Sequence, residues 1–209
     1  MQLAALRSSP QGRFYDWTIM TFQLISPAVL QAITLSEAKA HLRVTASEED
    51  EFITGLIKSA MQLVESETGL SLITQTYRLW VDDLPQDHVV LLPRNPARNI
   101  VQIVWYDRQG TPVILPGSAY FFNSITRPAR LKFDRAACPA GPCNGIEVDF
   151  DAGFGEAGVD VPDLIKRALK ILIAHWYEFR GAYAPSDQPI SIPEAYTHLI
   201  RHYRQVRLL

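Results

Sequence analysis

The run from Val161 to Tyr183, VPDLIKRALKILIAHWYEFRGAY, constrains the fold more than any other part of the chain. It predicts a helix near residues 162–180, because Pro162 suits the first turn, where its missing N–H would have no partner. Asp163 complements the positive end of the helix dipole, and Gly181 can end the helix. Apolar residues cover far more than one stripe of this helix, so we expect it to be packed on two or three sides.

Two further helices are predicted ahead of it. Thr34 and Glu37 have the spacing of a capping box, which predicts a short helix near 35–42. A longer amphipathic helix is expected near 48–68, with Ser47 as its N-cap and Gly69 at its end. Its surface is acidic, since residues 46–67 hold one lysine, Lys58, against six acids: Glu48, Glu49, Asp50, Glu51, Glu65 and Glu67.

After Gly69 the apolar period changes from about 3.6 to about 2, which marks the passage from helix to strand. Asp107 to Gly110 has the pattern of a type I hairpin turn. The short strands and the absence of βαβ alternation favour an antiparallel sandwich or a small barrel. The expected strands are Thr74–Val81, His88–Leu92, Ile100–Tyr106, Pro112–Leu115, Tyr120–Asn123, Arg130–Phe133 and Ile146–Phe150.

The predicted fold class is therefore α+β: a small helical bundle with an inserted antiparallel sandwich or small barrel. A proline-rich tether, APSDQPISIP, leads to a last helix near 193–206. An amphipathic helix on a linker has less reason to pack on its own domain than on a neighbour. The expected parts are a partly extended N-terminal extension (1–33), a helical part (34–69), the β insert (70–155), the central helix (156–183), and the tether with a docking helix (184–209).

The bulk composition limits the function. With 209 residues, 47% of them hydrophobic and 20% charged, the chain is expected to be soluble and globular. Its net charge of −2 gives no overall attraction to nucleic acid or to anionic membranes. No apolar run reaches the ~20 residues that span a bilayer. Cys138 and Cys143 are expected to be reduced thiols, with a small disulfide loop as the alternative.

The motifs of enzymes are missing: GxSxG, HExxH, the phosphate-binding loop and the Rossmann glycine pattern do not occur. Asp149 to Gly158 is rich in acids and glycines but lacks the ligand order of a calcium loop, so a glycine-rich turn is favoured over a cation site. No catalytic residue and no cofactor is therefore expected.

Histidines in the last two predicted helices have spacings that occur among metal ligands. Glu194, His198 and His202 recur every four residues and share one helix face, although a solvated face explains them as well. His175 and Glu178 have the spacing found in di-iron bundles, but the chain lacks the further ligands such a site needs. We interpret His175 as a core or interface histidine.

The last predicted helix carries a basic patch with an interleaved tyrosine: Arg201, Tyr203, Arg204 and Arg207. Such a patch suits nucleic acid or an acidic protein surface. The acidic helix near 48–68 offers such a surface on a neighbouring copy. Contact between the two would be head to tail and could close a ring.

The order of elements adds a resemblance. Five segments follow one another in the chain: TLSEAKAHLRV, EEDEFITGLIKSAMQLVESETGLSLITQTYRL, LLPRNPARNIVQIVWYDRQG, VDFDAGFGEAGVDVPDLIKRALKILIAHWYEFRG and IPEAYTHLIRHYR. This ordered set resembles the head–tail connector (adaptor) family of long-tailed phages and prophages, and gene transfer agents carry similar adaptors. The resemblance covers Leu35 to about Arg204 and leaves residues 1–19 outside.

The resemblance implies a structural protein of the virion neck with no catalytic residues. It implies a ring of about twelve copies with rotational symmetry, assembled in the bacterial cytoplasm. The ring would lie under the portal protein, meet a stopper or tail-completion protein, and continue the channel in which DNA is only cargo. No membrane partner is implied.

Two sets of residues follow as hypotheses. The acidic helix and the β insert would cover two sides of the central helix, and a neighbouring subunit the third. The subunit interface would use Glu48, Glu49, Asp50, Glu51, Trp176, Tyr177 and Phe179. Portal docking would use Ile192, Tyr196, Leu199, Ile200, Arg201, Tyr203, Arg204 and Arg207.

Two other functions stay open at this point. The β insert could be a carbohydrate-binding module or part of a hydrolase, stacking sugars on Trp80, Trp105, Tyr106, Tyr120, Phe121 and Phe122, although such aromatics more often form a core. Alternatively, the chain could be a stopper or tail-completion protein of the same particle.

Overall fold

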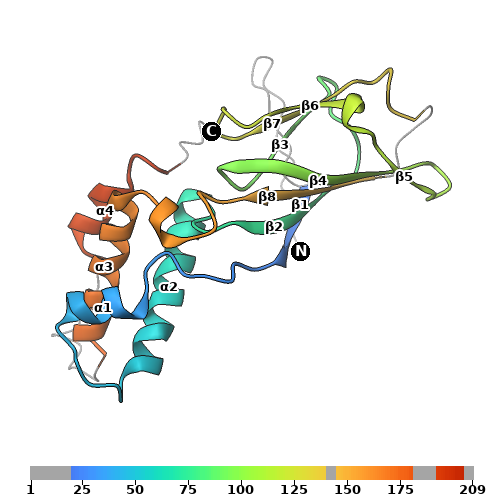
Figure 1. The fold of residues 1–209 in the computed structure, drawn as a ribbon. Helices are drawn as coiled ribbons and strands as arrows, with labels where there is room; N and C mark the ends of the chain where they lie inside the picture. The colour runs from blue at the N-terminus through green and yellow to red at the C-terminus, as the bar shows by residue number, and fades with distance from the viewer. Residues whose placement is uncertain (1–19, 140–144, 181–191, 205–209) are drawn as a thin grey trace, which may run out of the picture.

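The computed structural model describes residues 20–139, 145–180 and 192–204, and it places the helices at one end and the sheets at the other (Figure 1). None of the described helices is both long and apolar enough to cross a bilayer. The helices are α1 (Leu35–Leu42), α2 (Asp50–Thr68), α3 (Asp163–Glu178) and α4 (Glu194–Ile200). The strands are β1 (Met20–Ser26), β2 (Gln75–Val81), β3 (Val89–Leu91), β4 (Ala97–Tyr106), β5 (Pro112–Ile114), β6 (Tyr120–Asn123), β7 (Arg130–Phe133) and β8 (Ile146–Ala152).

The starts and ends of α1 and α2 follow their capping residues. Thr34 and Glu37 form the predicted capping box of α1. Gly69 ends α2 in the left-handed conformation, at φ 68°. The prediction that Ser47 caps α2 was wrong. The Asp50 N–H donates to the Ser47 carbonyl at 3.1 Å in a separate turn, so α2 begins later and Glu49 caps it without a side-chain hydrogen bond.

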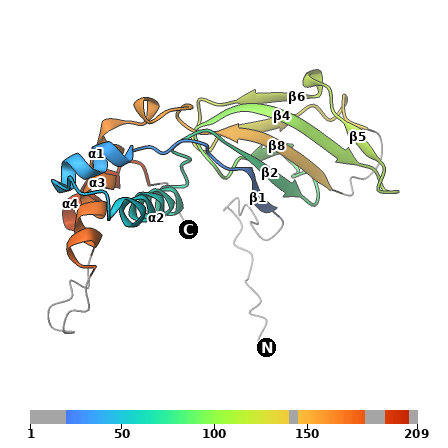
Figure 2. The ribbon, with the colours of Figure 1, turned by 60° about the horizontal axis from the view of Figure 1, so that its bottom comes forward.

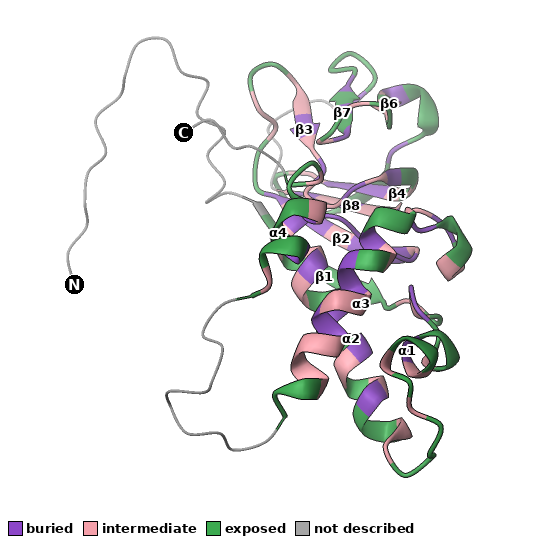
Figure 3. Ribbon diagram, turned by 90° about the vertical axis from the view of Figure 1, so that its left-hand side faces the viewer, coloured by how far each residue is buried: buried purple, intermediate pink, exposed green. Residues whose placement is uncertain are grey.

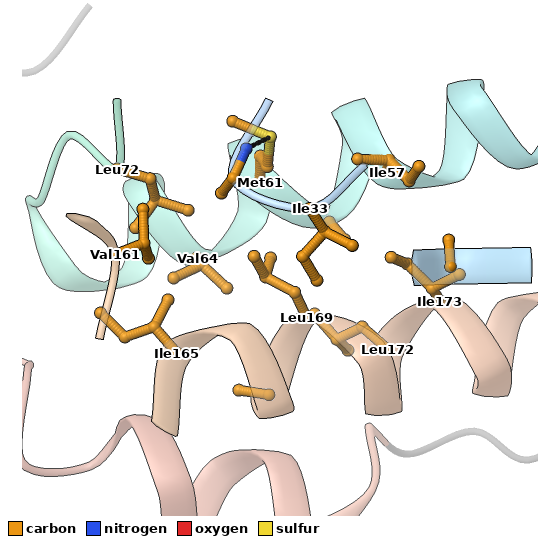
Figure 4. Close-up of a cluster of buried hydrophobic side chains, with 14 of the residues drawn as sticks. Ile33, Ile57, Met61, Val64, Leu72, Val161, Ile165, Leu169, Leu172 and Ile173 are labelled. Atoms are coloured by element: carbon orange, nitrogen blue, oxygen red, sulfur yellow. Dashed lines mark hydrogen bonds between the residues drawn. The ribbon is translucent and has the colours of Figure 1, made fainter. Parts of the chain in front are cut away.

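The central helix α3 is packed against three helices of its own chain: α1, α2 and α4. Figure 4 shows part of its buried side, including Ile165, Leu169 and Leu172, against Val64 and Met61 of α2. The prediction that the β insert covers one side of this helix holds only for the start of the insert, where Leu70, Leu72 and Ile73 join the helical core, whereas its strands do not pack on α3. Each helix is buried along one side and exposed along the other (Figure 3). Gly181, the predicted end, lies outside the described residues.

The β insert forms two antiparallel sheets. One has the strand order β1-β2-β8-β4-β5 and the other the order β3-β7-β6. Both contribute to one hydrophobic core, in which the rings of Trp105 and Phe133 lie 6.5 Å apart. The α+β class is confirmed, and the described strands do not close into a barrel.

Every predicted strand is present, with small changes at the ends. β4 begins at Ala97 rather than Ile100, and β8 continues to Ala152. The β4–β5 turn is the predicted hairpin. Its Gly110 N–H donates to the Asp107 carbonyl at 2.9 Å, and φ is 79° at this glycine.

Strand β1 was not predicted as a strand. It pairs antiparallel with β2, Met20 opposite Val81, and forms an edge of the larger sheet. The second sheet does not cover it, and Phe22, Leu24 and Ile25 are each more than 40% exposed. Because neither face of β1 is fully buried, its sequence lacks the alternation of apolar and polar residues that identifies a strand.

The last helix, α4, packs on its own chain, so the prediction that it would pack on a neighbour was wrong. Its Tyr196 and Ile200 are completely buried in the helical core. α4 also ends at Ile200, well before the predicted 206.

Candidate interaction surfaces

The four acids predicted for the subunit interface differ in whether they form ion pairs within the described chain. Glu49 accepts a hydrogen bond from the Tyr177 hydroxyl and forms an ion pair with Arg180 at 3.0 Å, so it joins the start of α2 to the end of α3. Asp50 forms an ion pair with Lys39 of α1. Glu48 and Glu51 are exposed and have no ion-pair partner among the residues that the structure describes. Only these two acids are therefore available to a partner without breaking a contact within the chain.

The three aromatic residues predicted for the subunit interface differ in exposure. Tyr177 is part of the contact between α2 and α3, because its hydroxyl donates to Glu49 and its ring centre lies 6.4 Å from that of Phe52. Trp176 is half-buried against the helical core. Phe179 is 44% exposed, with its ring 5.0 Å from that of His175. Phe179 and the exposed part of Trp176 are thus the apolar surface at this end of α3.

Some of the predicted portal-docking residues are buried in the subunit and others are exposed. Tyr196 and Ile200 are core residues, and Leu199 and Tyr203 pack partly against the same core. Burial, together with Glu67, raises the pKa of the Tyr196 phenol. Ile192 and Arg201 are exposed, and Arg207 lies outside the described residues.

The basic end of the chain meets the acidic helix within one subunit. Arg204 forms an ion pair with Glu67 of α2 at 2.8 Å, and the Tyr196 hydroxyl donates to the same carboxylate oxygen at 3.0 Å. The head-to-tail contact that we predicted between these two regions of neighbouring copies is therefore made, at least by Arg204, inside the chain. The Arg204 guanidinium is therefore already paired with Glu67 of its own subunit.

No group of three or more metal-ligating side chains occurs in the described ranges. Glu194, His198 and His202 are exposed on and just after α4. In the run considered as a calcium loop, Asp149 lies on β8 and forms a bidentate contact with Arg78, at 2.7 and 2.8 Å. The favoured glycine-rich turn follows this strand. Cys138 is a buried free thiol, and Cys143 is not among the described residues.

The aromatic side chains of the β insert are distributed over the core and the outer face of the sheet. Trp105 is buried, while Tyr120 and Phe122 pack against the β core. Trp80 and Tyr106 both donate to Glu147 on the outer face, each at 3.2 Å. Phe121 is 68% exposed. These positions do not form a common stacking surface for a sugar.

Two hollows border the exposed side of α3, and sequence reasoning did not predict them. The first lies between α1 and α3, and the second between α3 and α4; Arg167 and Ile171 line both. The first is lined by Glu37, His41, Asp163, Lys166, Arg167, Lys170 and Ile171. The second is lined by Leu164, Arg167, Ile171, Glu194, Ala195, His198 and Leu199. Because each joins helices that are distant in sequence, no local pattern could reveal it.

A polar joint fixes the helical end to the sheets. The Glu65 carboxylate accepts from the Leu72 N–H at 2.8 Å and from the Gln75 amide at 3.0 Å. Arg94 donates to the Glu65 carbonyl at 2.7 Å. The buried Asn95 side chain accepts from the Ala129 N–H at 3.1 Å. Burial raises the pKa of Glu65. The joint holds the end of α2 in a defined position beside the sheets.

Comparisons with known proteins agree with the resemblance noted in the sequence. The model of the phage gp6-like head-tail connector protein family matches residues 32–111. A search of curated protein sequences found no match. Among solved structures, a chain from the neck of an empty gene transfer agent particle with C6 symmetry is similar, with a TM-score of 0.75 and 24% identity over 90% of this chain and 97% of that chain.

Two further solved structures are similar. One is a chain from the virion of a native gene transfer agent particle, with a TM-score of 0.73. The other is the neck of a native particle with C12 symmetry, with a TM-score of 0.74. Both are 23% identical over 90% of this chain and 97% of the other. The fold is therefore shared along nearly the whole described chain.

Proposed function

We propose that this chain is a structural head–tail connector (adaptor) of a phage or phage-like particle, which joins the capsid to the tail at the virion neck. The observation that carries this proposal is the match of the connector family model to residues 32–111, which include α1, α2 and the strands β2, β3 and β4. The likeness in fold to chains of particle necks supports it. The role is structural rather than catalytic.

The assembly that we propose is a ring of about twelve copies, assembled in the cytoplasm, that continues the DNA channel below the portal. The C12 and C6 symmetry of the similar neck structures supports a cyclic arrangement. The portal protein lies on one side of the ring, and a stopper or tail-completion protein on the other. DNA is cargo in the channel.

We assign parts of the subunit to these contacts. The helical parts (34–69 and 156–183), with α4, form the ring body, and the β insert (70–155), with β1 at its edge, is a two-layered sandwich. The remainder of the segments 1–33 and 184–209 serves contacts. Glu48, Glu51, Trp176 and Phe179 lie at the subunit seam. Ile192, Arg201 and Arg207 dock to the portal, since Tyr196 and Ile200 are occupied in the core.

Light scattering of the purified protein, alone and mixed with its portal, tests the proposal. A connector gives a multimer or a stable complex with the portal ring. A monomer that never engages a portal and binds sugar would favour the carbohydrate-binding alternative. Binding only to a preformed connector ring, and never to the portal, would favour a stopper or tail-completion protein.

A portal pull-down with surface variants tests the docking assignment. Deleting residues 185–209 would remove Tyr196 and Ile200 from the core and would confuse folding with docking. We therefore choose Arg201→Glu, whose side chain is exposed. Reduced portal capture by Arg201→Glu, with unchanged capture by the exposed control Lys132→Glu on β7, supports the assignment. Equal capture by both contradicts it.

A further inference from the structure

The outward face of α2 contains a glycine that the subunit does not need. Gly55 lies in the first half of this 19-residue helix and is exposed. A Cβ built at this position meets no atom within 4 Å, so no neighbour in the described chain requires its absence. Glycine inside a helix is less stable than alanine. Packing within the subunit therefore does not explain this glycine, whereas close approach of another backbone would.

The residues around Gly55 form a surface that is both apolar and acidic. Phe52, one turn earlier, is 42% exposed and forms the edge of this surface nearest α3, since its ring centre lies 6.4 Å from that of Tyr177. Glu48 and Glu51 are exposed beside it and have no ion-pair partner in the described part of the chain. Ser59, one turn later, is also exposed. We call these five residues the α2 face.

A second exposed surface, which carries an arginine, lies across the helical layer. α2 and α3 pack through their buried sides, and α1, α3 and α4 all lie on one side of α2 (Figures 1 and 2). The exposed side of α3 therefore points away from the α2 face. It carries Arg167, which has no ion-pair partner among the described residues, between Leu164, which is 49% exposed, and the half-buried Ile171. We call these three residues the α3 face.

We propose that the α2 face of one copy docks on the α3 face of a second copy of this chain, head to tail. The inference rests on the proposed ring. A rotational ring larger than a dimer needs two different patches on each subunit, and patches on opposite sides of one helical layer meet that need. Glu48 and Glu51 on one face can pair with Arg167 on the other, which steers association and selects the partner surface. Gly55 allows the second copy to approach closely.

Two variants, each disabling one face, test the contact. Gly55→Gln places a long side chain on the α2 face, where the open space leaves the subunit fold intact. Arg167→Glu reverses the charge of the α3 face at an exposed position. Gly55→Gln should melt at or above the wild-type temperature and Arg167→Glu close to it. Neither should form rings, alone or with the portal. Ser36→Gln, exposed on α1 outside both faces, is the matched control and should form rings like the wild type.

Mixing the two variants gives the sharper result. Each retains the face that the other has lost, so one contact can form but a ring cannot close. The mixture should therefore give 1:1 dimers by light scattering, and neither variant alone should do so. A mixture that stays monomeric contradicts the head-to-tail pairing. Rings formed by both variants contradict the interface and leave the proposed function intact. A wild type that forms no ring, alone or with the portal, contradicts the proposed function itself.

Discussion

Arg204, just beyond α4, forms an ion pair with Glu67 near the end of α2, with 2.8 Å between the guanidinium and carboxylate atoms. The Tyr196 hydroxyl donates to the same carboxylate oxygen at 3.0 Å. Glu67 therefore attaches the last helix to the longest helix of the same subunit. An exposed ion pair is worth about 0–1 kcal/mol, so we expect most of the stabilisation to come from the buried tyrosine.

Glu67→Ala should lower the free energy of unfolding by about 2 kcal/mol, because the hydroxyl of the buried Tyr196 loses its charged acceptor. Urea denaturation measures the loss. Arg204→Ala is the control for the ion pair alone and should cost less than about 1 kcal/mol. Equal losses in the two variants would contradict this assignment.

Raising the pH should destabilise the protein through Tyr196. Burial raises the pKa of its phenol in the folded state, whereas the unfolded chain ionises near the ordinary pKa of about 10. The contribution to stability is therefore fully present below about pH 10 and is lost as the pH rises toward the folded-state value. Tyr196→Phe should make the free energy of unfolding fall less steeply above about pH 10 than in the wild type. Parallel curves for the two proteins would show that this phenol does not cause the loss.

Glu65 should give a pH dependence at the acidic end. Burial raises its pKa above the ordinary value of 4.5, against the opposing effects of the Leu72 N–H, Arg94 and Gln75. The folded state then binds the proton more tightly than the unfolded state, so the stability from Glu65 falls as the pH rises through the raised pKa. In Glu65→Gln that fall is absent, so the free energy of unfolding of the variant should rise relative to that of the wild type as the pH increases above 4.5. A constant difference across this range would contradict the raised pKa.

Asn95→Ala should destabilise the β insert next to the joint, because the Asn95 side chain bonds the Ala129 N–H and the Leu92 carbonyl within that insert. The variant leaves the Ala129 N–H without its acceptor in a buried site, at a cost of about 1–3 kcal/mol. Asn99→Ala is the matched control, because the Asn99 side chain is exposed where it donates to Asp151. Its effect on the free energy of unfolding should stay within about 0.5 kcal/mol. Similar losses in urea denaturation for the two variants would contradict a stabilising role of the buried Asn95–Ala129 hydrogen bond.

Local patterns predicted much of this fold. The capping box at Thr34, the glycine that ends α2 and the hairpin turn at Asp107 depend on residues within a few positions of one another, and each was predicted correctly. Strand β1 was missed because both of its faces remain partly exposed. The place of α4 was missed because the Glu67–Arg204 contact joins residues 137 positions apart. The hollows beside α3 depend on the same long-range packing.

Trp176→Ala should weaken ring assembly more than it weakens folding. The side chain is half-buried against the helical core, and we expect a neighbouring subunit to cover the exposed remainder. Urea denaturation of the monomer and light scattering of the ring separate the two effects. Unfolding of the monomer without any separate assembly defect would make Trp176 a core residue of one subunit only.

Negative-stain imaging of the purified protein mixed with its portal tests the central claim most directly. A head–tail connector gives class averages of a closed ring, stacked coaxially on the portal, with rotational symmetry and an open central channel. Averages that show the portal alone, with this chain left as a monomer, would contradict the account.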